Sequence, residues 1–210
     1  MENFRRELTR LDLERMRIPE RYWDATLGLV SDTRDSESPR GIVSKYLAKI
    51  DELYARGVGL FLWGNNGLGK TCASVVIGKE YRRRGRTVLF MPAAKISAAR
   101  IQNDMFDSDQ SIWDRCSSVD VLLLDDLGKG SQDNTGFGKR ILDELVRDRS
   151  SRRKVTFITT NMQPGEQLGD ALKESTLASL KECIVPVQFE GPDLRDAAVS
   201  EIRQMLAMEG

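Results

Sequence analysis

A glycine-rich stretch of eight residues constrains the fold of this chain more than any other feature. Residues 64–71 read Gly-Asn-Asn-Gly-Leu-Gly-Lys-Thr and match the pattern G-x-x-x-x-G-K-[S/T] in full. An apolar segment at 58–63 precedes the stretch, and a helical pattern over 70–84 follows it. The glycines let backbone N–H groups turn inward around phosphates, and the helix N-terminus adds the positive end of a dipole. The stretch therefore predicts a strand, a phosphate-binding loop and a helix in succession.

The residue types in this loop predict separate roles in binding ATP and Mg²⁺. We expect Lys70 to reach the β- and γ-phosphates and the Thr71 hydroxyl to bind the metal. Cys72 directly after the loop and Arg195 near the end of the chain are added to the nucleotide-binding set. The full predicted set is Gly64, Asn65, Asn66, Gly67, Leu68, Gly69, Lys70, Thr71, Cys72 and Arg195.

Two consecutive acids follow a second apolar segment, which reads Val-Leu-Leu-Leu-Asp-Asp over 121–126. A buried strand delivers Asp125 at its carboxyl end, where the carboxylate can hold magnesium through water. Asp126 then stands where many ATPases place a second acid, usually glutamate, that orients the attacking water. A helix cap or a solvated turn is the structural alternative. With the phosphate loop present, we expect a metal role for Asp125 and a catalytic role for Asp126.

Asn161 follows another apolar segment, Val155–Thr160. An amide that emerges beside the two preceding strands would point toward the γ-phosphate and could sense its presence. An asparagine in an ordinary turn is the alternative. The phosphate loop favours the sensor role, so Asn161 joins the predicted catalytic residues.

Apolar segments alternate with helical patterns along the rest of the chain. This alternation predicts an α/β fold, a P-loop NTPase core with a five-stranded, mostly parallel sheet and helices on both faces. The predicted strands are 58–63, 87–91, 119–124, 155–160 and 184–189. The predicted helices are 70–84, 93–106, 111–116, 139–149, 167–181 and 193–208.

Residues 1–40 are predicted to form a helical extension and a linker ahead of an ATPase core over 41–210, with no evident C-terminal lid domain. Phe4, Leu8 and Leu11 recur at helical spacing, and the helix is expected to end at Ile18-Pro19.

The polar residues 31–39 are predicted to form the linker. A single amphipathic helix is expected after it, from Ile42 to Tyr54, and Gly57 ends it.

The composition excludes several classes of site. The sequence has no histidine, so a zinc site or an imidazole base is not expected, and its three cysteines form no C-x-x-C pair. Its 32 basic and 32 acidic side chains cancel, so tight nucleic-acid binding would need a local patch, an assembly or a partner. The absence of a signal-like N-terminus or a long apolar run predicts a cytoplasmic protein without membrane contact.

The three motifs, in this order and at this spacing, resemble the AAA+ group of DnaC- and DnaI-type helicase loaders and IstB-type transposition ATPases. Residues 18–22 (Ile-Pro-Glu-Arg-Tyr) and 189–195 (Phe-Glu-Gly-Pro-Asp-Leu-Arg) support the resemblance, which covers 18–206. It implies an ATPase that assembles into homo-oligomers with ATP and delivers a partner to DNA. The expected DNA is single-stranded and bound weakly by the chain alone, and the expected partner is a replicative helicase or a transposase.

The sequence departs from this group at the arginine finger, which relatives place before the fifth strand. No arginine lies between Arg153 and Arg195, and Lys181 is the candidate substitute, a point charge without the forked donors of arginine. Weak hydrolysis by the chain alone is therefore expected. An IstB-like regulator and an ATP-switched adaptor remain open as alternatives. A small-molecule kinase is disfavoured, because such enzymes usually have an arginine-rich lid and this sequence shows none.

Basic residues offer further DNA candidates, namely the runs 82–86 and 149–154 and the single Lys95. Ordinary solvated helix ends are the alternative for the two runs. Tyr22 and Trp23 are candidates for packing against adenine, with core packing as the alternative.

Overall fold

Five parallel strands form one sheet in the order β2-β3-β4-β1-β5. The protein is seen in a computed structural model, which describes residues 6–32, 37–96, 112–128, 137–163, 180–181 and 183–207. The strands are β1 (Gly59–Gly64), β2 (Val88–Pro92), β3 (Val121–Leu127), β4 (Val155–Thr160) and β5 (Ile184–Phe189). The predicted α/β class and five-stranded sheet are therefore confirmed.

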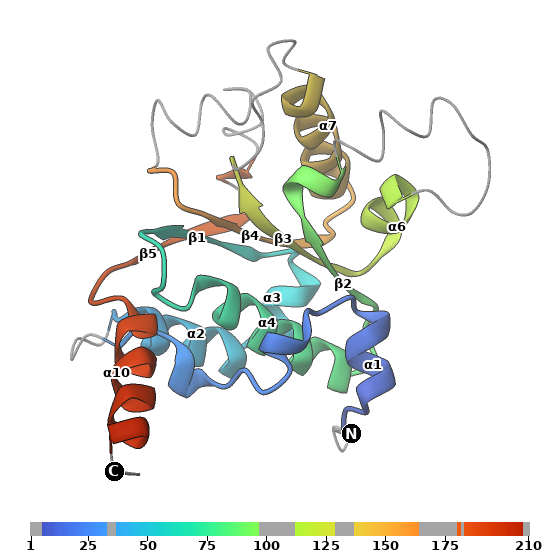
Figure 1. Ribbon diagram of the computed structural model, residues 1–210. Helices are drawn as coiled ribbons and strands as arrows, with labels where there is room; N and C mark the ends of the chain where they lie inside the picture. Colours follow the sequence, from blue (N-terminus) through green and yellow to red (C-terminus); the bar gives the residue numbers. More distant parts are fainter. Residues whose placement is uncertain are drawn as a thin grey trace.

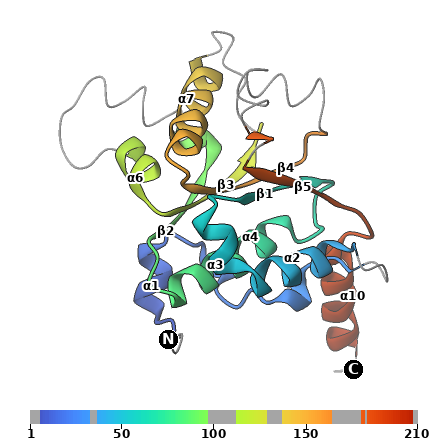
Figure 2. The ribbon, with the colours of Figure 1, turned by 180° about the vertical axis from the view of Figure 1, so that it is seen from behind.

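Helices cover both faces of the sheet, and both views agree on their placement (Figures 1 and 2). One face carries α6 (Ile112–Ser118) and α7 (Phe137–Ser151). The other carries α1 (Arg10–Arg15), α2 (Pro39–Ala48), α3 (Ile50–Ala55), α4 (Lys70–Arg83) and α10 (Leu194–Ala207), together with the 3-10 turns η1 (Glu20–Tyr22) and η2 (Leu27–Leu29). Most of the predicted helix 167–181 and residues 97–106 of the predicted helix 93–106 lie outside the described residues.

The side chains of β1 point alternately into two apolar cores, one on each face of the sheet. Leu60 and Leu62 pack into the core that includes Val75 and Ile77 of α4, whereas Phe61 packs into the core on the opposite face. Successive strand residues point to opposite faces, so an uninterrupted apolar strand is stable only when both faces are covered. This double burial is the physical reason for the continuous apolar segments in the sequence.

The N-terminal helix differs from the prediction. Leu8 precedes α1, and Leu11 is 51% exposed, so the spacing of these leucines does not mark a buried helical face. Thr9 starts the helix instead, because its side chain and that of Asp12 form a capping box. Phe4 lies outside the described residues.

The single helix predicted from Ile42 to Tyr54 is also wrong, because the chain forms two helices, α2 and α3. Ser38 caps the first through a 3.1 Å hydrogen bond from Gly41 N, and Pro39 occupies its first turn. Lys49 has non-helical dihedrals of −114° and 20° and separates the two.

Residues 10–30 pack against the same core as β1. Met16, Ile18 and Val30 are at most 3% exposed, and Phe90 N of β2 donates to Met16 O at 2.7 Å. The division of the chain at residue 40 stays a prediction, but this N-terminal segment shares its apolar core with the sheet. None of the described helices is long and apolar enough to span a membrane.

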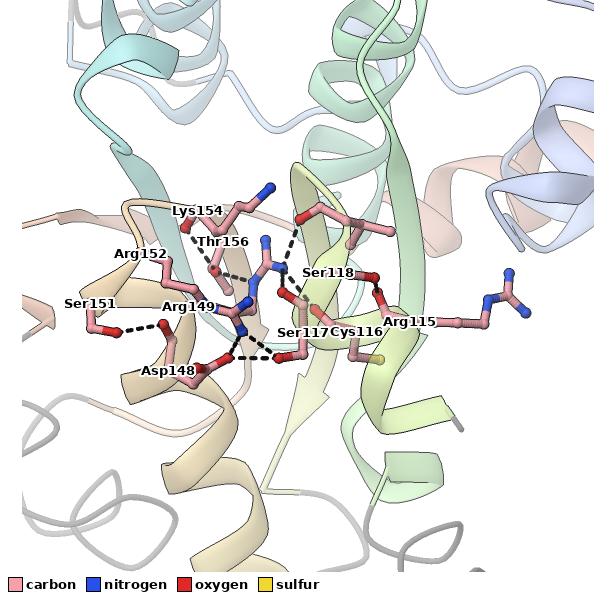
Figure 3. Close-up of polar contacts among 11 residues, drawn as sticks. Arg115, Cys116, Ser117, Ser118, Asp148, Arg149, Ser151, Arg152, Lys154 and Thr156 are labelled. Atoms are coloured by element: carbon pink, nitrogen blue, oxygen red, sulfur yellow. Dashed lines mark hydrogen bonds and ion pairs between the residues drawn. The ribbon is translucent and has the colours of Figure 1, made fainter. Parts of the chain in front are cut away.

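Arg149 is a buried structural residue, and the prediction that the run 149–154 is either a DNA contact or a solvated helix end is wrong at this position. Arg149 lies at 0% exposure near the end of α7 (Figure 3). Its guanidinium donates to Cys116 O at 2.7 Å, Val119 O at 2.9 Å and Val155 O at 2.7 Å. Burial lowers the pKa of Arg149 to about 10. One side chain thus joins the end of α6 to the first residue of β4.

We expect Arg149→Ala to lower the free energy of unfolding by about 3 kcal/mol or more, because buried carbonyls lose their donor. Urea denaturation measures the loss. Arg152→Ala is the matched control on the same helix end, since its side chain is 46% exposed and pairs with Asp148. Its cost should stay below about 1 kcal/mol. Equal losses in the two variants would contradict the structural role of Arg149.

Candidate functional site

The carboxyl ends of β1, β3 and β4 meet at a cavity of about 660 Å³. Parallel strands present their carboxyl ends at one edge of a sheet, and ligands of such sheets bind there. Eleven of the predicted site residues line the cavity. They are Asn66, Gly67, Leu68, Gly69, Lys70, Thr71, Cys72, Asp125, Asp126, Asn161 and Arg195.

The phosphate loop has the backbone that the glycines predict. Gly64, Gly67 and Gly69 have φ values of 132°, 76° and 86°, a region that side chains rarely adopt. A Cβ atom on Gly69 would lie 2.2 Å from Leu29 O, so the loop also packs closely on the N-terminal segment. The glycines therefore allow both the backbone conformation of the loop and its close packing on the N-terminal segment.

Lys70 begins α4 and reaches back over the loop. Its Nζ donates to Gly64 O at 2.7 Å and to Asn65 O at 2.5 Å. Burial lowers the pKa of Lys70 to about 8, and the carboxylates of Asp125 and Asp126 act against this shift. Gly64 and Asn65 do not line the cavity but hold the lysine that does.

Asp125 is held by two hydroxyl groups. Its Oδ1 accepts from Thr71 Oγ1 at 2.9 Å and from Thr159 Oγ1 at 2.7 Å. Burial raises the pKa of this carboxyl, and the two hydroxyl donors lower it. The hydroxyl predicted to bind magnesium therefore lies in direct contact with the predicted acid of β3.

Asp126 has a left-handed backbone, with φ 59°, at the register irregularity between Leu124 and Leu127. Its backbone N donates to Thr159 Oγ1 at 2.9 Å. A non-glycine residue in this region is uncommon, and such conformations concentrate at functional sites. Thr159 thus positions both acids, which the sequence did not reveal because only Asn161 was singled out at the end of this strand.

The neighbouring Asn161 follows a threonine that fixes the end of β4. Thr160 Oγ1 donates to Leu127 O at 2.7 Å and accepts from Met162 N at 3.0 Å. These two bonds hold the backbone on both sides of Asn161. The asparagine lines the cavity together with Asp125 and Asp126, as its position after the strand predicts.

The N-terminus of α10 closes another side of the cavity. Leu194 N donates to Gly67 O at 3.0 Å, and Asp193 Oδ1 accepts from Arg195 N at 2.8 Å. A Cβ atom on Gly67 would lie 1.7 Å from Asp193 Oδ1. A side chain at this position would therefore displace the Asp193 carboxylate, and the contact between the loop and α10 places Arg195 beside the phosphate loop.

Lys181 is remote from this cavity within one chain. It is exposed and precedes β5, whose first residue Ile184 pairs with Gly59 at the start of β1. The phosphate loop follows the opposite end of β1. Lys181 can therefore approach a nucleotide only in a neighbouring subunit, and its catalytic role stays a prediction.

Three cavity residues come from the N-terminal segment, namely Arg21, Tyr22 and Leu29. Tyr22 lines the cavity and also packs against the apolar core, so its contact with adenine stays a prediction. Trp23 packs against the same core and donates from Nε1 to Ile18 O at 2.8 Å. The sequence marked Arg21 only as part of a resemblance, because a lone exposed arginine carries no local signal of a binding role.

The basic run 82–86 is engaged within the chain. Arg82 pairs with Asp12 at 2.8 Å, Arg84 pairs with Asp51 at 2.6 Å, and the guanidinium of Arg86 lies 4.0 Å from the ring centre of Tyr54. These three arginines thus have partners within the chain, and a DNA contact of the run stays a prediction. Lys95 is exposed, and its DNA contact stays a prediction.

The arrangement fits magnesium bound together with nucleotide phosphates. The described residues contain no group of three or more Cys, Asp or Glu side chains that could hold a metal ion alone. Mg²⁺ usually takes one or two protein oxygens, with phosphates and waters completing its shell. Thr71 and Asp125, whose oxygens lie 2.9 Å apart, offer that number of ligands at the loop.

The sequence and the fold are similar to those of known replication proteins. No family model matches the sequence. The replicative helicase loader DnaI of Bacillus subtilis is 25% identical over 168 residues, which cover 73% of this chain and 52% of DnaI. The chain therefore spans about half the length of this curated relative.

Solved structures show the same fold. The DnaC helicase loader superposes with a TM-score of 0.69 at 21% identity, covering 82% of this chain and 100% of that one. The initiator DnaA bound to AMPPCP and single-stranded DNA superposes with a TM-score of 0.63 at 19% identity, covering 87% of this chain and 55% of that one. The expected resemblance to AAA+ helicase loaders is confirmed in sequence and fold.

We expect Gly67→Ala to cost about 1 kcal/mol more in unfolding free energy than Gly85→Ala, because the Asp193 carboxylate that caps α10 has to move. Gly85 is the matched control, since its φ is 79° and no atom lies within 4 Å of its added Cβ. Both substitutions place a side chain at nearly the same positive φ, 76° at Gly67 and 79° at Gly85. Chemical denaturation gives the difference, and a smaller cost at Gly67 than at Gly85 would argue against the contact.

ATP binding should weaken as the pH rises through about 8, the pKa of Lys70 in the free protein. The charged ammonium attracts phosphate, and above this pH it must first regain a proton. The dissociation constant of ATP is expected to rise by up to roughly tenfold from pH 7 to pH 9. Titration calorimetry on wild type and Lys70→Ala tests this. The pH step should be absent from the variant, and its persistence there would assign it to another group.

Proposed function

We propose that this chain is an ATP-binding helicase loader of the DnaC/DnaI type that assembles with ATP on DNA and recruits a replicative helicase. One observation carries the proposal. The cavity of an AAA+ fold brings the phosphate loop, Asp125, Asp126 and Asn161 together. The similarity to the helicase loader DnaI supports the choice within that fold.

The residues divide the work of ATP binding and hydrolysis among them. Lys70 and the loop N–H groups would hold the phosphates, while Thr71 and Asp125 would hold Mg²⁺, whose charge would offset that of the phosphate oxygens. Asp126 accepts a hydrogen bond from the attacking water and orients it. Asn161 donates its amide to the γ-phosphate and so distinguishes ATP from ADP. Thr159 keeps both acids in place through its hydroxyl.

Hydrolysis by the chain alone is proposed to be slow. An arginine supplied in trans can accelerate such reactions by several powers of ten. The sequence has no arginine between Arg153 and Arg195, and Lys181 lies at the edge of the sheet opposite the phosphate loop. A neighbouring subunit or a partner would therefore have to complete the site.

Single-stranded DNA is the proposed nucleic-acid ligand. The related fold of DnaA has been solved with AMPPCP and single-stranded DNA. The equal numbers of 32 basic and 32 acidic side chains favour binding by an assembly, in which weak local contacts add.

Light scattering with ADP, with ATP and with ATP plus single-stranded DNA tests the proposal. Wild type is expected to form a large assembly with ATP and DNA, and Lys70→Ala is expected to stay monomeric because its loop lacks the phosphate-binding ammonium. Lys49→Ala is the matched control, since Lys49 is exposed and outside the cavity.

The loader proposal would be contradicted if the wild-type protein binds ATP but remains monomeric under every condition. That result would favour the ATP-switched adaptor, in which a partner supplies the missing half of the site. Equal loss of assembly in Lys70→Ala and Lys49→Ala would exclude a specific role for nucleotide binding.

A further inference from the structure

Arg21 places an additional cation at the cavity, outside the phosphate loop and the strand ends that carry the acids and Asn161. Its side chain lines the cavity together with Lys70 and Asp125. Among the described residues Arg21 forms no ion pair, whereas Arg10 in the same segment pairs with Glu14 and Glu20.

The ring of Tyr22 supports the Arg21 side chain. The guanidinium carbon lies 4.7 Å from the ring centre, within the range of a cation–π contact. A guanidinium that lies over a ring can still use its N–H edge to bind another group. That edge is the part of arginine that matches the oxygens of a phosphate group.

The backbone beneath Arg21 is held from two sides. Lys79 of α4 donates from Nζ to Ala25 O at 3.2 Å and also to Trp23 O. Ile18 and Ala25, on either side of η1, are 3% and 6% exposed. The arginine therefore projects from a segment fixed to the same helix that begins with Lys70. Such anchoring reduces the entropy cost of ordering the side chain on a ligand.

We propose that Arg21 binds the phosphate chain of the nucleotide in cis, opposite the phosphate loop. The inference rests on the proposed nucleotide binding but not on helicase loading. The cavity then carries three cations, Lys70, Arg21 and Arg195, against the carboxylates of Asp125 and Asp126. A triphosphate with one Mg²⁺ retains net negative charge, which this surplus of cations matches.

Two probes separate a phosphate contact from a contact with adenine. ATP and inorganic tripolyphosphate are titrated into the full chain with Mg²⁺, and affinity is read by calorimetry or by competition with a fluorescent ATP analogue. Arg21→Ala is expected to weaken both ligands by roughly tenfold to hundredfold, the range for a lost charged hydrogen bond. Arg21→Lys should retain part of the affinity, because it keeps the charge but not the fork.

Arg10→Ala is the matched control. Arg10 also stacks on an aromatic ring of this segment, with its guanidinium carbon 4.9 Å from the ring centre of Trp23, but it does not line the cavity. Its affinities for both ligands should equal those of wild type. Unchanged tripolyphosphate binding in Arg21→Ala would overturn the proposal in favour of adenine. An equal loss in Arg10→Ala would overturn it as well, since the effect would then belong to the segment. Failure of wild type to bind ATP would instead refute the proposed function.

Discussion

The parallel pairing of β1, β4 and β3 is the constraint on which the site depends. Phe61 pairs with Ile158, and Leu124 pairs with the same Ile158 from the other side. This register brings the end of β1, which leads into the phosphate loop, level with Asp125 and Thr159. A shift by one residue would turn every side chain to the opposite face and remove Thr159 from Asp125. The apolar cores on both faces oppose such a shift, because they require Leu60 and Leu62 on one side and Phe61 on the other.

The N-terminal segment adds a second layer of constraint around the phosphate loop. Ser31 N donates to Leu68 O at 3.2 Å, and Arg40 donates to Val30 O at 2.9 Å. Gly69 packs so closely on Leu29 O that a Cβ atom would lie 2.2 Å away. Because α10 contacts the same loop from another side, the loop joins two segments far apart in the sequence. A change in the loop on nucleotide binding would therefore alter its contacts with both the N-terminal segment and α10.

The electrostatic state of the site follows from its partial burial. Lys70 satisfies its ammonium with the carbonyl groups of Gly64 and Asn65, and burial still lowers its pKa to about 8. Asp125 is buried too, and its two hydroxyl donors partly offset the rise in its pKa. Phosphates and magnesium would stabilise the charged forms of both residues. The free site thus carries an electrostatic cost that nucleotide binding can relieve, as expected for a site built for charged ligands.

The sequence by itself determined the phosphate loop, the acids after β3, the asparagine after β4 and the α/β class. These signals are local, since each depends on a short motif beside an apolar strand, and parallel strands always present their carboxyl ends together. It did not determine the break at Lys49, where the backbone leaves the helical region, or the start of α1 at Thr9, where capping outweighs apolar spacing. Tertiary structure alone decided that Arg149 is buried and joins α6 to β4, and that Thr159 positions both acids. It also decided that Lys181 lies at the end of the sheet opposite the phosphate loop and that Arg21 lines the cavity. These facts depend on strand register, side-chain direction and long-range packing, which bring together residues that share no pattern along the chain.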